Sequence, residues 1–176
     1  MSRRDRLRRV VILCRNFAVN LAYYRVGRRP EHLALQQRQR GNFWRATNGN
    51  FIDSCVLEWC KLFADPKGKH HWGKIVSDPA NFETQLLNHL AIDGAAFQKE
   101  IEVMRQYRDK FLAHLDSDEV MNIPALDIAK KAVWFYHAFI VQREAQPGDL
   151  VGLPTDLDAG YAQCEDEARL IYEHNA

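Results

Sequence analysis

The sequence has 176 residues, of which 47% are hydrophobic and 27% charged, as is ordinary for a folded globular domain. No apolar run approaches the roughly 18 residues that a membrane span needs, and Arg15 and Asn16 break the apolar stretch that follows the first arginines. We therefore expect a single helical domain over residues 1–176, located in the cytoplasm and not in a membrane.

The charge is unevenly distributed along the chain. Residues 1–45 contain 12 arginines and only Asp5 and Glu31, whereas residues 46–176 contain 12 Lys and Arg against 21 Asp and Glu. Such an asymmetry favours either an anionic partner or self-association, in which the basic segment of one subunit meets the acidic face of another. The alternative is a solvated basic helix. We expect basic N-terminal helices in residues 1–47 to pack on a core formed by residues 48–176.

The sequence carries no sign of a cofactor or a structural metal. Its cysteines lie in apolar helical patterns without a Cys-x-x-Cys pair, as expected of buried thiols in a reducing compartment. There is no Gly-rich phosphate loop, no Gly-x-Ser-x-Gly and no His-Glu-x-x-His. The adjacent His70 and His71 point in different directions and have no third ligand at suitable spacing. We expect no cofactor and no metal.

The first half of the chain is helical by pattern. Leu7, Val10, Cys14, Phe17, Leu21 and Tyr24 recur at steps of three or four, which predicts a helix over about 6–27. Residues 31–47 are polar and compatible with a helix, with a break at Gly41. A second amphipathic segment runs from Phe51 to about Ala64, and the residues 48–50 before it form either a turn or an irregularity inside one long helix. The sequence Asp-Pro-Lys-Gly at 65–68 ends it.

The second half continues the pattern. Asp78 before Pro79, and then Asp93, have the character of N-caps, for a short helix through Leu90 and a helix over about 94–116. Pro124 suits the first position of a helix over 125–143, which is apolar nearly all round and is therefore either central or covered by a partner subunit. A last helix over 156–174 has an acidic outer face. The prediction is an all-α, up-and-down bundle of four to five main helices with short extra helices.

One stretch, residues 107–116, places charges among apolar residues. Arg108 continues the apolar stripe of Phe97, Ile101 and Met104 at helical spacing. An unpaired Arg on such a face costs several kcal/mol as an order of magnitude, so that it needs a carboxylate, a carbonyl or a bound anion as its partner.

The same stretch contains the groups for phosphodiester chemistry. Arg binds phosphate in bidentate fashion, His acts as acid and base near neutral pH, and Asp109 could orient either one. On an ideal α-helix, Arg108 and His114 stand about 9 Å apart along the axis and about 120° around it. They cannot touch, but both can line one groove, which a second copy across a two-fold axis could complete.

Residues 108–114, Arg-Asp-Lys-Phe-Leu-Ala-His, match the Rx4–6H motif of HEPN domains, and residues 107–116 most resemble the abortive-infection AbiU-type HEPN group. The resemblance implies a helical bundle that dimerises and joins two motifs in one cleft. It also implies a metal-independent endoribonuclease of toxin or phage-defence type, with a cognate antitoxin as a further partner. In that site Arg108 would hold the scissile phosphate and His114 would serve as acid and base. Asp109 would position these catalytic groups.

Further residues could contact RNA, and other interpretations remain open. The RNA-contact candidates are Tyr107, Lys110, Lys69, His70, His71 and Lys74. In the loop at 69–74 the alternative is solvated cations with Trp72 tucked into the core. For Arg108 one alternative is a structural ion pair with a buried carboxylate such as Asp109 or Glu58. Another is a non-catalytic helical module that uses the same groove and the basic N-terminal helix to hold nucleic acid, a nucleotide or a protein partner.

Overall fold

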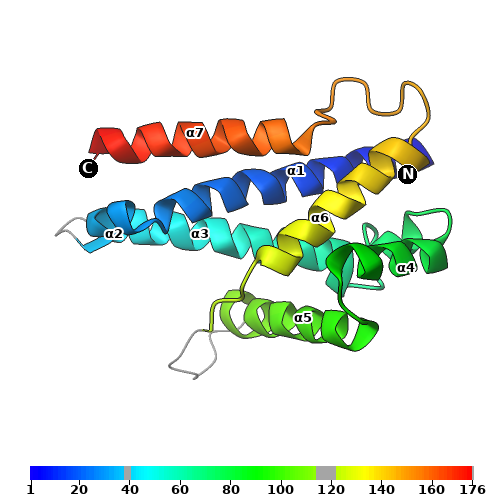
Figure 1. Cartoon of the computed structure of the whole chain (residues 1–176), viewed down its shortest axis with the longest axis horizontal. Helices are drawn as coiled ribbons and strands as arrows, with labels where there is room; N and C mark the ends of the chain where they lie inside the picture. Colours follow the sequence, from blue (N-terminus) through cyan, green and yellow to red (C-terminus); the bar gives the residue numbers. More distant parts are fainter. Residues whose placement is uncertain (38–40, 114–121, 176) are drawn as a thin grey trace.

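The protein is an all-α bundle, as the sequence predicts (Figure 1). The computed structural model describes residues 1–37, 41–113 and 122–175, and these contain seven α-helices and no strand. The helices are α1 (Arg3–Gly27), α2 (Pro30–Gln37), α3 (Asn42–Trp59), α4 (Pro79–Leu90), α5 (Gly94–Tyr107), α6 (Asp127–Phe139) and α7 (Leu157–Asn175). A short 3₁₀ helix, η2 (Trp72–Lys74), precedes α4.

Helix α1 lies between α3 and α7 and forms part of the main core (Figure 1). It begins at Arg3 because Ser2 and Asp5 form a capping box, in which each side chain accepts a hydrogen bond from the backbone N–H of the other residue. The predicted seam from Leu7 to Leu21 is fully buried. These residues share one cluster with side chains from residues 52–161, so α1 contributes directly to the main core.

A smaller cluster closes the far end of α1. Val26, Leu35, Ala168 and Tyr172 form it, at the point where α2 and α7 meet. A Cβ on Gly27 would lie 2.3 Å from Tyr172 Oη, so only glycine allows this close approach. The predicted break at Gly41 is confirmed, since α3 starts directly after it, and residues 48–50 lie inside α3.

The predicted caps of α4 and α5 are also confirmed. The side chain of Asp78 accepts from Asn81 N at 3.1 Å, and that of Asp93 accepts from Ala96 N at 2.7 Å. The prediction for Pro124 is wrong, because α6 begins only at Asp127 and Pro124 is buried in the irregular segment before it. Asp127 stands in the first helical turn, where a carboxylate is favoured, and it pairs with Arg25 at 2.5 Å.

Three of the helices end in a π-helical turn. These turns are η1 (Cys60–Ala64) after α3, η3 (Arg108–Ala113) after α5 and η4 (Ile140–Glu144) after α6. Since π turns are rare and concentrate at functional sites, the residues on these three turns are candidates for functional residues.

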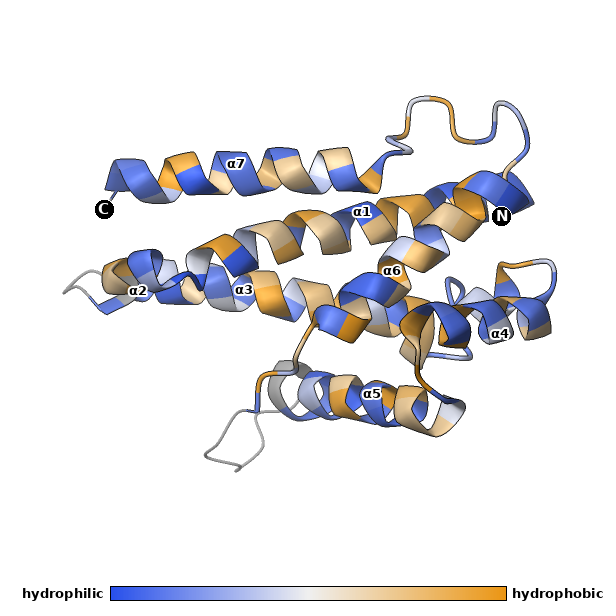
Figure 2. Cartoon of the chain, viewed as in Figure 1, coloured by the Kyte–Doolittle hydropathy of each residue, from blue (hydrophilic) through white to orange (hydrophobic). Residues whose placement is uncertain are grey.

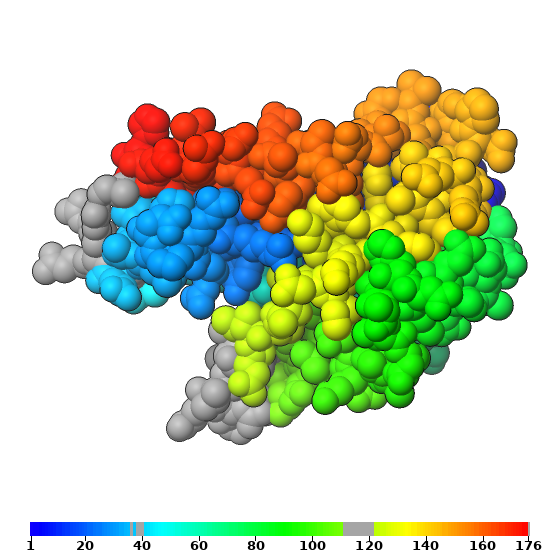
Figure 3. All heavy atoms as spheres, viewed as in Figure 1, coloured from blue at the N-terminus to red at the C-terminus, as the bar shows by residue number. Residues whose placement is uncertain are grey.

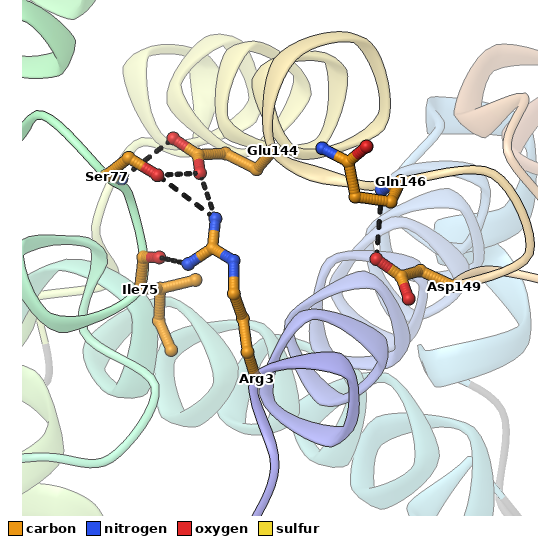
Figure 4. A network of polar contacts seen from close by, with 6 residues as sticks. All are labelled: Arg3, Ile75, Ser77, Glu144, Gln146 and Asp149. Atoms are coloured by element: carbon orange, nitrogen blue, oxygen red, sulfur yellow. Dashed lines mark hydrogen bonds and ion pairs between the residues drawn. The ribbon is translucent and has the colours of Figure 1, made fainter.

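The end of η4 is tied to the start of the chain by a polar network (Figure 4). The buried carboxylate of Glu144 accepts from Arg3, from Ser77 N at 2.8 Å and from Ser77 Oγ at 2.7 Å. Arg3 also donates to the carbonyl of Ile75 at 3.2 Å. Three segments that are distant in sequence are therefore fixed around one carboxylate.

The basic α1 meets the acidic α7 of the same chain. The hydroxyl of Tyr23 in α1 donates to Glu167 at 3.0 Å, and Arg29, two residues after the end of α1, pairs with Glu165 at 3.8 Å. Figure 2 shows that most of the ribbon of α7 is hydrophilic. Part of the charge asymmetry is thus balanced within one subunit. None of the helices in the described ranges is long and apolar enough to cross a membrane.

The four thiols differ in burial. Cys14, Cys55 and Cys60 are buried, and Cys164 is partly exposed beside α1. Burial raises the pKa of Cys60 to about 12, and it also raises the pKa values of Cys14, Cys55 and Cys164. All four are free.

Candidate functional site

Arg108 stands where α5 passes into η3, with its side chain 21% exposed. Its Nε donates to Asp109 Oδ1 and its Nη1 to Asp65 Oδ1, both at 2.7 Å. Arg108, whose burial without a partner would be unfavourable, therefore has two carboxylate partners. Asp109 was among the predicted partners, whereas Glu58 instead accepts from Lys61 at 3.1 Å.

Asp65 is the site residue that the sequence analysis missed. It ends η1, where its backbone N–H donates to the carbonyl of Cys60 at 3.0 Å, and this places its side chain against the end of α5. In the sequence Asp65 belongs to the Asp-Pro-Lys-Gly turn motif, so it was predicted only to end a helix and not to pair with Arg108. The available signal was a carboxylate directly after an apolar helix, facing a helix that carries an Arg on its apolar stripe.

The two carboxylates are accessible to solvent. The side chain of Asp65 is 39% exposed and that of Asp109 56% exposed. The hydrogen bond to Asp109, and then that to Asp65, raise the pKa of Arg108 against the opposing effect of its partial burial. Within the described ranges no group accepts a hydrogen bond from Nη2 of Arg108.

Neighbouring side chains attach α5 to α3 and to η1. Arg105 donates to the carbonyl of Ala64, and the hydroxyl of Tyr107 donates to Asp53 at 2.7 Å. Tyr107 is only 2% exposed, and both burial and this hydrogen bond raise its pKa. The expected RNA contact of Tyr107 is thus not supported, because the helix turns this side chain into the core.

His71 is likewise a structural residue. Gly73 N donates to its Nδ1 at 3.2 Å, so its Nε2 carries the proton and donates to the carbonyl of Phe63 at 3.1 Å. Burial lowers the pKa of His71. Trp72 stacks on Phe82 with ring centroids 5.2 Å apart, which agrees with the alternative of a Trp tucked into the core. An RNA contact by His71 is not supported.

The remaining predicted RNA contacts lie at or near the surface. Lys69 and Lys74 are exposed, His70 and Lys110 are partly exposed, and Lys74 donates to the carbonyl of Lys67 at 2.7 Å. The pKa of His70 is lowered, first by burial and then by the nearby cations Arg9 and Lys61. This loop follows directly on Asp65, so it starts at the Arg108 ion pairs.

His114 lies outside the described residues. The described chain before it, η3, is a π-helical turn that ends at Ala113. The structure thus brings Arg108 and Asp109 together, adds Asp65, and says nothing of the third catalytic candidate.

Comparisons with known proteins add no relative. No family model matches the sequence, and neither the curated proteins nor the solved structures give a significant match. In the described ranges no three His, Cys, Asp or Glu side chains are grouped so that they could hold a metal ion.

Proposed function

We propose that the protein is a metal-independent endoribonuclease of the HEPN type, acting in a toxin or phage-defence system as a cytoplasmic homodimer. The observation that supports this most directly is the position of Arg108. It is partly exposed on a π turn at the end of a core helix, it is oriented by Asp109, and its Nη2 meets no acceptor in the described ranges.

The chemistry assigns one role to each group. Arg108 binds the non-bridging oxygens of the phosphate and stabilises the charge that develops on them. His114 accepts the proton of the ribose 2′-OH while the 2′-oxygen forms a bond to phosphorus, and an acid returns a proton to the departing 5′-oxygen. The products are a 2′,3′-cyclic phosphate and a 5′-hydroxyl. Asp109 holds the guanidinium through Nε and is a positioning residue.

The test is cleavage of RNA by the purified chain in the presence of EDTA. Arg108→Ala and His114→Ala should each reduce the rate by about 100-fold or more, since each removes phosphate binding or proton transfer. Arg169→Ala is the matched control, because this exposed Arg of α7 is also paired with a carboxylate, Asp166 at 2.8 Å. Uncleaved RNA with a folded wild-type protein, or equal cleavage by the His114 variant, would refute the proposal.

A non-catalytic binding module is the second candidate, because the ion pair between Arg108 and the exposed Asp65 can exchange its carboxylate for another anion. If Asp65 competes with phosphate for Arg108, Asp65→Asn should lower the Kd for RNA, and in this candidate neither the variant nor the wild type cleaves the RNA. If the pair is only structural, Asp65→Asn should reduce thermal stability and leave RNA binding unaffected. Measuring Tm and the Kd for RNA on the same variant distinguishes the two.

A further inference from the structure

A hollow lies between α4 and the end of α6, and its walls include none of the residues of the Arg108 ion pairs. Its volume is about 340 Å³, within the range of roughly 300–1,000 Å³ typical of small-ligand sites. Figure 3 shows the atoms of α4 in green beside those of α6 in yellow on this face of the molecule. Its walls include Gln85 and His89 of α4, Phe135, Ala138 and Phe139 of α6, and Arg143 of η4.

Aromatic rings form the floor of this groove. The ring of His89 lies 5.2 Å from that of Phe135 at an interplanar angle of 35°, and Phe135 lies 6.0 Å from Phe139. Ala138, whose side chain is a single methyl group, also lines the groove. Such a floor suits a planar ring, because aromatic faces stack on any base with little dependence on its identity.

The polar groups of the groove favour an anion. The guanidinium of Arg143 lies 5.5 Å from the centroid of the Phe139 ring, and it has no carboxylate partner in the described part of the chain. None of the described residues that line the groove is Asp or Glu, whereas the amides of Gln85 and Gln142 stand among them. These groups match the parts of a nucleotide. The cation suits its phosphate, the aromatic rings suit stacking of its base, and the amides suit the polar edge of that base.

The groove is also rigidly built. Glu144, the next residue after Arg143, is held inside by Arg3 and Ser77 (Figure 4). The contacts of Glu144 therefore fix the turn that carries Gln142 and Arg143, and this lowers the entropic cost of binding a ligand.

We propose that the groove between α4 and α6 binds one nucleotide, with its ring stacked on the His89–Phe135 side and its phosphate on Arg143. This site is independent of cleavage at Arg108. The nucleotide is either free or the terminal unit of an RNA strand, and the two sources share the same recognition chemistry.

Calorimetric titration with AMP and with adenosine at low ionic strength tests the proposal. Adenosine should bind at least about tenfold more weakly, since it lacks the phosphate. Arg143→Ala should reduce AMP affinity to the level of adenosine and remove most of its salt dependence, while the Arg108→Ala variant should bind AMP as the wild type does. An RNA oligonucleotide with a 5′-terminal AMP that binds more tightly than AMP identifies an RNA end as the source, and weaker binding identifies the free nucleotide.

Filling the hollow gives an independent check. Ala138→Trp should abolish AMP binding, whereas Ala162→Trp, the same change on the exposed face of α7, should leave it unchanged. If Ala138→Trp does not fold, Gln142→Ala replaces it, with a loss of several-fold expected for one amide contact. Three results would overturn the proposal: no AMP binding, binding that depends on Arg108 and not on Arg143, or a dimer of the chain that covers the groove and excludes AMP.

Discussion

Helices α5 and α6 both end in a π-helical turn, and the ion pairs at the two turns differ in how far their carboxylates are exposed. At η3, Arg108 is joined to Asp65 and Asp109, whose side chains are 39% and 56% exposed. At η4, Glu144 is 4% exposed and is bound by Arg3 and by Ser77. At η3 the carboxylates are exposed to solvent, and at η4 the carboxylate is buried and accepts hydrogen bonds from both Arg3 and Ser77.

This difference has an energetic meaning. A solvent-exposed ion pair contributes roughly 0–1 kcal/mol and exchanges readily with other anions. A buried carboxylate that loses its donors leaves a charge without compensation, which costs several kcal/mol as an order of magnitude. The Glu144 corner is therefore suited to holding the fold, and the Arg108 corner to exchanging its partner.

The largest effect is expected at Glu144. Glu144→Ala leaves Ser77 N–H and the guanidinium of Arg3 without their acceptor, and should lower the free energy of unfolding by about 2–3 kcal/mol. Urea denaturation measures it. Glu173→Ala, which removes an exposed carboxylate of α7, serves as the control and should cost less than about 0.5 kcal/mol. Equal losses of unfolding free energy in the two variants would show that the buried Glu144 network does not stabilise the fold more than an exposed carboxylate does.

A smaller effect is expected at Arg108. Because its carboxylates are exposed, Arg108→Ala should destabilise by no more than about 1 kcal/mol, and less in high salt. The same urea denaturation, repeated in low and in high salt, provides the comparison with Glu144→Ala. A loss as large as that of Glu144→Ala would show that Arg108 is a structural residue, and would weaken the proposed role in phosphate binding.

The smallest effect concerns pH. Burial lowers the pKa values of His71 and His137 in the folded protein, so the unfolded chain binds protons first as the pH falls. The stability that these residues contribute is complete above the unfolded pKa of about 6.5 and is lost as the pH falls below it toward the folded values. Thermal unfolding between pH 7.5 and 5.5 should show a decline, and His71→Asn should reduce its slope. An unchanged slope would contradict the assignment to His71.

Local chemistry made most of the fold predictable. The seam of α1, the break at Gly41 and the caps Asp78 and Asp93 follow from spacing and from side chains that bond to their own backbone. Pro124 misled because proline is tolerated both inside a first helical turn and before one, and here it stands three residues before the first residue of α6. The π turns have no sequence signature of this kind.

The candidate site was predictable only in part. The need for an anionic partner of Arg108 followed from its place on the apolar stripe, and Asp109 is adjacent in sequence. Asp65 is 43 residues away from Arg108, so that only the packing of η1 against α5 brings them together. Tyr107 shows the opposite limit: it ends the α-helix α5 three residues after the buried Met104, and its side chain belongs to the core, where its hydroxyl donates to Asp53.

The unequal burial of the four cysteines has a practical use. Cys14, Cys55 and Cys60 are shielded by the core, whereas Cys164 lies partly exposed next to Tyr23 and Arg15 at the junction of α1 and α7. A thiol reagent applied to the native protein should therefore attach to one position, slowly, because burial raises the pKa of Cys164. A fluorophore at that position would report on the separation of the basic and acidic helices without any cysteine having to be removed.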